Sequence, residues 1–192
     1  MAEEENSNLE KMLKESSEET AATIAKKQFK EKQTLQYKRM VKMLPFQIFL
    51  LVADADGKID PKEVAQFKEF LSRREKHCSN QYTRRMYHST VINYSALTNR
   101  FQGGHIKKDY NIVKNAMDYV AMCVNPKVML AICDDLKDLA VAIAEASGGF
   151  MGVTSPVSKE EKEVIKSLEG IFAEASTKAS EIEVPDQFSF EF

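Results

Sequence analysis

Apolar residues recur at helical spacing along most of this chain, and few residues interrupt them. Its 192 residues include only seven glycines and five prolines, whereas the helix formers alanine, glutamate, lysine, methionine and leucine are frequent. A turn-rich all-β fold needs more chain reversals than so few turn-forming residues supply. The pattern therefore predicts an all-α protein.

The apolar positions mark about six to seven helices. Besides an N-terminal amphipathic helix at about 8–32, the pattern predicts helices at residues 37–53, 61–71, 79–101, 106–123, 126–147 and 158–172. Within the helix at 37–53, Pro45 either introduces a kink or marks the first turn. Asp60 and Ser158 are expected N-caps, because each is followed three residues later by a glutamate, the spacing of a capping box.

This organisation predicts one domain with an extension on each side. We expect a charged amphipathic extension at residues 1–35, a single helical-bundle domain at residues 36–176 and an extended C-terminal tail at residues 177–192. Chains of this length commonly form one domain. The tail alternates phenylalanine with polar residues after Pro185, which is typical of an extended recognition segment.

Charge is strongly segregated, although the formal net charge is only −2. Residues 1–20 carry seven acids and two bases, and residues 26–42 carry seven bases and one acid. Residues 131–192 are acidic again, with thirteen acids and five bases. Such polarity suits docking between oppositely charged faces.

The cysteines and the apolar stretches bear on the cellular compartment. Cys78, Cys123 and Cys133 are odd in number and show no CxxC spacing, so we expect free, buried thiols in a reducing compartment. The first residues lack the basic and apolar regions of a signal peptide, and no stretch of about eighteen apolar residues occurs. We predict a cytoplasmic protein, with peripheral membrane association through a partner as an open alternative.

The run from Val52 to Glu63 concentrates the potential chemistry of the chain. Three aspartates, a glycine and a glutamate lie here between two apolar helical stretches. Their spacing matches positions 3, 5, 6, 8 and 12 of an EF-hand calcium loop, but position 1 is Val52, which offers no side-chain oxygen. The missing ligand argues against a tight EF-hand site.

A second segment repeats part of this pattern. Residues 53–63 align with residues 144–161 after an inserted eight-residue loop, which places Glu161 at the position of the glutamate in the first copy. If the two helix–loop–helix units face each other, their carboxylates converge. A concentration of like charge recruits a cation or a basic partner.

The stretch from Phe46 to Phe70 resembles the signature of TerB-like tellurite-resistance domains, and the same module is similar to the N-terminal domain of a membrane-anchored DnaJ-type co-chaperone. In that family an aliphatic helix ends in A-x-A-D-G, followed by a hydrophobic residue, a capping residue and a helix with a glutamate in its first turn. Residues 158–161 supply the family's second element, S-x-E-E. The resemblance covers residues 40–175.

The resemblance implies an all-α domain, an acidic cluster proposed to bind metal, and a role in stress-response assemblies at the cytoplasmic side of membranes. The resemblance assigns the acidic, metal-binding cluster of the family to six carboxylates of this chain: Asp54, Asp56, Asp60, Glu63, Glu160 and Glu161. All offer hard oxygen ligands, so Ca²⁺ or Mg²⁺ is the expected cation. The alternative stays open that the loop is a helix cap and a solvated turn without a ligand.

No pattern in the chain indicates catalysis or a small-molecule substrate. His77, Cys78 and His88 lack the second paired motif of a zinc site, and no GxGxxG, Walker or GxSxG motif occurs. Basic residues interleaved with aromatic ones at residues 73–110 form a pattern that is typical of nucleic-acid binding. The acidic net charge and the core-like spacing of the aromatic residues disfavour it. We therefore predict that the chain is not an enzyme.

Apolar side chains placed regularly near both ends of the sequence predict contacts with a partner protein, with packing onto the chain's own domain as the alternative. The candidates are Leu9, Met12, Leu13, Phe188, Phe190 and Phe192. The sequence thus predicts a non-enzymatic TerB-like binding module, divalent-metal-binding and stress-related, that acts through protein contacts. The alternative is an accessory subunit of a larger assembly with no metal role.

Overall fold

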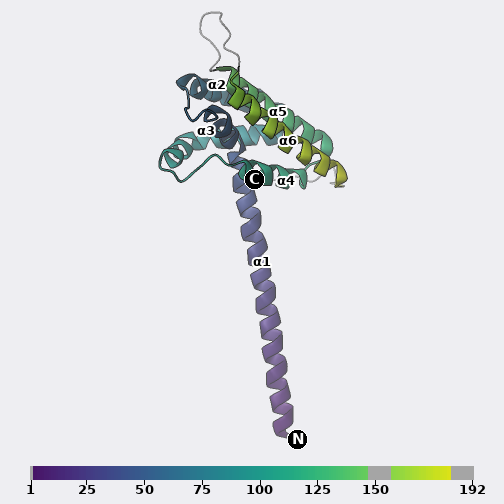
Figure 1. Cartoon of the computed structure of the whole chain (residues 1–192). Helices are drawn as coiled ribbons and strands as arrows, with labels where there is room; N and C mark the ends of the chain where they lie inside the picture. The colour runs from purple at the N-terminus through teal and green to yellow at the C-terminus, as the bar shows by residue number, and fades with distance from the viewer. Residues whose placement is uncertain (1, 147–156, 183–192) are drawn as a thin grey trace, which may run out of the picture. The chain divides into compact units, whose positions relative to one another are not determined.

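The computed structural model describes residues 2–146 and 157–182, with side chains described for Thr23 and from residue 26 on. These residues form six helices (Figure 1): α1 (Ala2–Ala53), α2 (Pro61–His77), α3 (Gln81–Gln102), α4 (Tyr110–Ala121), α5 (Pro126–Ala146) and α6 (Lys159–Glu181). No strand occurs in the described ranges. The prediction of an all-α fold is therefore confirmed, whereas the predicted extended segment from residue 183 lies outside the described residues.

The chain forms two compact units, residues 1–37 and residues 38–192. The first unit consists of the earlier part of α1, and the second contains the remainder of α1 together with α2 to α6. The predicted boundary after residue 35 thus falls inside α1. The boundary predicted after residue 176 falls inside α6, where the following Ala179 is still buried.

α1 is one continuous helix, whereas the sequence pattern predicts two helices in the same range. α1 runs through residues 33–36, which contain neither glycine nor proline, and it continues past Pro45. Pro45 therefore does not begin a helix. A proline within a helix removes one hydrogen-bond donor, and burial of the residues on both sides of Pro45, such as Leu44 and Phe46, holds the helix together here.

The last turns of α1 form the centre of the second unit. Every residue from 44 to 53 is buried, as expected for a helix segment that is apolar on all sides. Phe49 stacks on Phe67 of α2 with ring centroids 4.4 Å apart. Phe46 meets Tyr94 of α3 edge-on at 6.4 Å. These aromatic contacts fix α2 and α3 around the end of α1.

A buried amide connects α1 to the segment before α4. Gln47 has no exposed surface, and its Nε2 donates to the Lys107 carbonyl at 3.2 Å while its Oε1 accepts from the Asp109 N–H at 3.3 Å. Asp109 in turn caps α4 by accepting from the Asn111 N–H. α4 consequently begins at Tyr110, later than the predicted start at 106.

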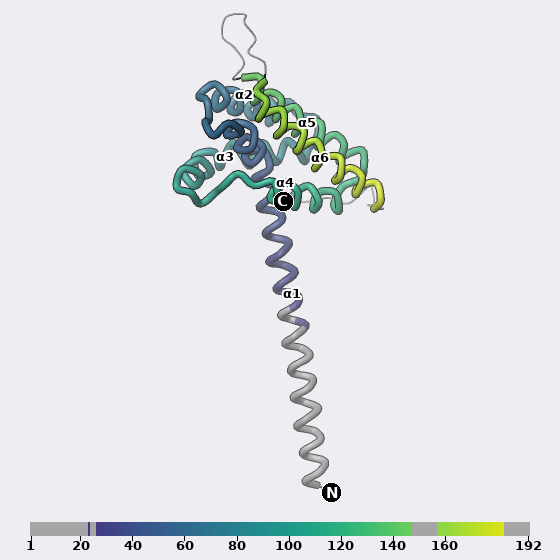
Figure 2. The backbone as a smooth tube through the Cα atoms, in the orientation of Figure 1, coloured from purple at the N-terminus to yellow at the C-terminus, as the bar shows by residue number. Residues whose placement is uncertain are grey.

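The remaining helices pack around this centre. α5 packs against both α2 and α6, and α6 also packs against α4 (Figures 1 and 2). α5 begins at Pro126 and α3 ends before Gly103, as the sequence predicts. Within the described ranges, no helix has the length and apolar character that crossing a bilayer requires.

Candidate functional site

The loop between α1 and α2 is organised by its own aspartates. Lys108 Nζ lies 2.9 Å from Asp54 Oδ2 and also donates to the Asp54 backbone carbonyl. The exposed Asp56 accepts from the Lys58 N–H, with 3.0 Å between N and Oδ1. Gly57 has a φ of 84°, a left-handed conformation that glycine adopts without steric cost. Both aspartates therefore stabilise the turn.

Two capping boxes begin α2 and α6, as the sequence predicts. The Asp60 side chain accepts from the Lys62 N–H at 2.7 Å, and Glu63 Oε2 accepts from the Asp60 N–H at 2.8 Å. In α6, Ser158 Oγ accepts from the Glu161 N–H at 3.1 Å, and Glu161 Oε2 accepts from the Ser158 N–H at 2.7 Å. The two glutamates thus satisfy backbone donors that a helix start leaves open.

The two capping glutamates lie within electrostatic range of each other. Glu63 is 4% exposed and Glu161 is 5% exposed. Burial above all, and then repulsion from the carboxylates of Glu161, Asp60 and Asp56, raises the pKa of Glu63 to about 7, although the hydrogen bond from the Asp60 N–H acts in the opposite direction. The charge of Glu161 thus acts on Glu63, whereas the meeting of two helix–loop–helix units that the internal repeat suggests stays a prediction.

The predicted metal ligands are only partly brought together. Asp54 pairs with Lys108, and Glu160 is exposed in the first turn of α6. Among the side chains that the structure describes, no group of three or more His, Cys, Asp or Glu is placed to share one metal ion. The Ca²⁺ or Mg²⁺ site stays a prediction.

Folding of the chain is linked to the ionisation of Glu63. Its pKa of about 7 in the folded chain lies above the ordinary value of 4.5, so the folded state binds this proton more tightly than the unfolded state. The resulting stabilisation is complete below about pH 4.5 and is lost as pH rises through about 7, a change on the order of 3 kcal/mol. We expect Glu63→Gln, which keeps an oxygen for the Asp60 N–H, to flatten this decline.

The measurement is the free energy of unfolding in urea at several pH values between about 5 and 8, a window that spans this ionisation. Glu160→Gln is the matched control, because Glu160 lies in the corresponding first turn of α6 but is exposed. It should keep the wild-type dependence on pH. A Glu63→Gln profile parallel to that of the wild type would contradict the linkage.

The predicted partner-binding residues lie outside what the structure describes. Leu9, Met12 and Leu13 belong to α1, but their side chains are not among those described. Phe188, Phe190 and Phe192 lie beyond residue 182. Their role in binding a partner stays a prediction.

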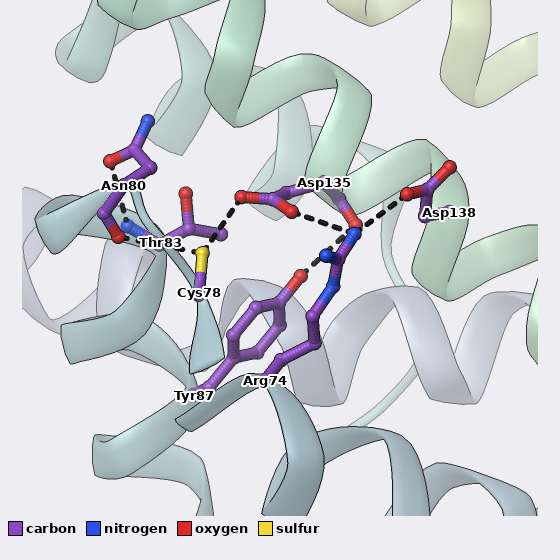
Figure 3. Close-up of polar contacts among 7 residues, drawn as sticks. All are labelled: Arg74, Cys78, Asn80, Thr83, Tyr87, Asp135 and Asp138. Carbon is purple, nitrogen blue, oxygen red and sulfur yellow. Dashed lines mark hydrogen bonds and ion pairs between the residues drawn. The ribbon is translucent and has the colours of Figure 1, made fainter. Parts of the chain in front are cut away.

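Figure 3 shows a polar cluster where α2, α3 and α5 meet. Arg74 Nη2 lies 2.8 Å from Asp135 Oδ1 and 2.6 Å from Asp138 Oδ2. The Cys78 thiol donates to Asp135 Oδ2 at 3.0 Å, and the Tyr87 hydroxyl donates to the Asp135 carbonyl at 3.0 Å. Asp135 thereby joins three helices.

Sequence reasoning missed this cluster. It placed Arg74 in a basic run, and the acids that neutralise Arg74 lie more than sixty residues further along the chain. The available signal was the spacing of Asp135 and Asp138, which lie three residues apart and therefore on one face of α5. That spacing does not indicate that the two aspartates contact Arg74.

The cluster and the other thiols offer no activated nucleophile among the described residues. Burial, followed by the hydrogen bond to Asp135, raises the pKa of Cys78 to about 11, so that it is a thiol at neutral pH. Cys123 and Cys133 are also free and buried, as predicted, and burial raises the pKa of each thiol. His88 pairs with Glu75 rather than with Cys78.

Asp135 and Asp138 form a matched pair for measuring what the cluster contributes. The Asp135 side chain is 12% exposed, whereas that of Asp138 is 63% exposed. We expect Asp135→Ala to lower the free energy of unfolding by on the order of 3 kcal/mol, because Arg74 and Cys78 lose a largely shielded partner. Asp138→Ala should cost about 0–1 kcal/mol. Equal losses in urea denaturation would show that the Asp135 carboxylate does not hold α5 to Arg74 and Cys78.

A groove of about 270 Å³ lies between the end of α1 and α3. Its lining includes three cations, Arg39, Lys42 and Arg100, and three apolar residues, Met43, Ala96 and Leu97. Ser89 and Asn93 complete it. No lining residue is acidic. Within the described part of the chain, none of the three cations forms an ion pair. The groove thus combines an apolar floor with a positive rim that is not neutralised.

Comparison with known proteins adds no relative: no family model, no curated protein and no solved structure matches this chain. The TerB-like resemblance accordingly stays a prediction.

Proposed function

We propose that this chain is a non-enzymatic helical module that binds a protein segment in the groove between α1 and α3. The observation that carries the proposal is the set of three cations around an apolar floor. An exposed cation that has no counterion within its own chain favours an anionic partner, and an apolar floor favours partner side chains over water. A segment with both acidic and apolar side chains meets both conditions.

The size of the groove favours side-chain anchors over a small-molecule ligand. Pockets for small molecules usually measure about 300–1,000 Å³ and enclose most of the ligand. The groove has about 270 Å³ and lies between two helices. A few anchoring side chains of a docked segment would fill such a volume, which is the usual way in which a groove between helices recognises a peptide.

The positions of the aromatic residues disfavour nucleic acid as the partner. Binding of single strands relies on aromatic side chains that stack on bases. Tyr87 is fully buried, and Tyr94 packs edge-on against Phe46 in the core. Of the basic run before them, Arg74 is neutralised by Asp135 and Asp138.

A photo-crosslinking residue in place of Ala96 tests the groove as a docking site, because Ala96 is exposed and lines it. We expect this residue to crosslink a partner protein in extracts of the native host, and we expect Arg39→Glu/Lys42→Glu/Arg100→Glu to abolish the crosslink. The same crosslinker in place of Lys166, exposed on α6, is the control. Crosslinks that are equal at both positions, or that survive the charge reversal, would refute the groove as the site.

Cation binding is a second candidate function, favoured by the convergence of Glu63 and Glu161. We expect calorimetric titration with Ca²⁺ or Mg²⁺ to release heat and the cation to raise the melting temperature, because a ligand of the folded state stabilises it. Asp56→Ala and Glu63→Gln should reduce both effects, and Glu75→Gln, on the opposite end of α2, should leave them unchanged. Absence of heat in the wild type would leave the loop as a helix cap, and the chain as an accessory subunit without a metal role.

A further inference from the structure

The described walls of the groove between α1 and α3 are helical backbone whose hydrogen bonds are already made. The lining residues all lie within these two helices, where backbone N–H and C=O groups bond to each other. Near the end of α3, the Arg100 carbonyl accepts from the N–H groups of His105 and Ile106. The Asn93 side chain donates to the Ser89 carbonyl at 2.8 Å. A segment that docks here therefore has to satisfy its own backbone.

This condition selects a helix over an extended segment. An extended segment commonly adds to the edge of a sheet, which supplies partners for its backbone, and the described part of this chain contains no strand. A polyproline segment docks between aromatic side chains, and none of the described lining residues is aromatic. Each backbone group that an extended segment buried here without a partner would oppose binding. A helix brings its backbone hydrogen bonds with it.

The groove has the shape that a helix of a few turns requires. On α3 the lining residues recur at intervals of three or four positions from Ser89 to Arg100, so they form one stripe along that helix. At about 1.5 Å per residue, this stripe is ~17 Å long, or about three turns. Ala96 lies exposed within the stripe. Its small side chain lets the backbone of a packed helix come close.

The charges of the groove determine which polar side chains that helix carries. Arg39 and Lys42 belong to the α1 wall, and Arg100 belongs to the α3 wall. Both walls thus carry cations, while Met43 and Leu97, one from each wall, contribute apolar surface. Acidic side chains on both flanks of an apolar stripe complement this arrangement, and basic side chains there would be repelled.

We propose that the groove binds an amphipathic helix of about three turns whose apolar stripe has acidic side chains on both flanks. This inference rests on the proposed function of the groove and specifies its partner. The apolar stripe contacts Met43 and Leu97, and the acids pair with Arg39, Lys42 and Arg100. Because so short a helix is marginal on its own in water, a free peptide with this pattern folds as it binds.

Selection from a displayed library of random peptides tests this partner class. The peptides have about 16 residues, enough for the three turns of the groove. The full chain is the bait, and peptides that Arg39→Glu/Lys42→Glu/Arg100→Glu also retains are discarded. Among the remaining peptides we expect apolar residues at spacings of three and four, flanked by aspartate or glutamate.

A second charge reversal is the matched control for the bait. Lys127→Glu/Lys162→Glu/Lys166→Glu changes three lysines that are exposed on α5 and α6, and it should retain the same peptides as the wild type. Unchanged thermal melting of both variants establishes that their folds are intact. Peptides that this control also loses would overturn the assignment of the acids to the groove.

Two substitutions in a selected peptide test its conformation. Proline at a central, solvent-facing position should weaken binding by about a hundredfold, because it breaks the helix, and alanine there should leave binding nearly unchanged. Fluorescence anisotropy measures both. Selected peptides that tolerate the proline, or that place apolar residues at every second position, overturn the helix but leave the groove as a docking site. Failure to select any groove-dependent peptide overturns the proposed function together with this inference.

Discussion

Complete burial of the end of α1 is the constraint on which the rest of the structure depends. Residues 44–53 have no exposed face, so other helices must surround them on every side. Phe46 and Phe49 place α2 and α3 against this segment. Gln47, the one side chain there with hydrogen-bonding groups, is satisfied by the backbone at Lys107 and Asp109. An unsatisfied amide at this position would cost about 1–3 kcal/mol, so the segment before α4 is held in place as well.

The buried carboxylates of the chain serve the fold, whereas its unpaired cations are available for binding. Glu63 and Glu161 satisfy the first backbone donors of two helices, and Asp135 joins three helices through Arg74, Cys78 and Tyr87. In each case at least one carboxylate oxygen already has a partner within the fold. The cations of the groove have no such partner in the described residues, which is why recognition is assigned to the groove and not to the acidic loop.

The sequence predicted structure correctly where the stabilising interaction involves residues close together in the chain. Asp60 and Ser158 were identified as N-caps because a capping box is complete within four residues, and the structure forms both boxes. The division of α1 into two helices at residues 33–36 was wrong, because this stretch contains neither glycine nor proline to end a helix. Pro45 does not begin a helix either, because burial of the neighbouring side chains compensates for the lost hydrogen bond. The internal repeat pointed to Glu63 and Glu161 as equivalent positions, but it did not indicate that each would use its Oε2 atom to cap its own helix.

The sequence by itself determined that the chain is all-α, where most of its helices begin and end, and that its three thiols are free and buried. Those properties depend on side-chain spacing of three or four residues and on hydrogen bonds within one helical turn. Only the tertiary structure decided that Arg74 meets Asp135 and that Arg39, Lys42 and Arg100 surround an apolar floor. These residues lie about sixty positions apart in the sequence, and their proximity results from how the helices pack around residues 44–53, which no local pattern encodes.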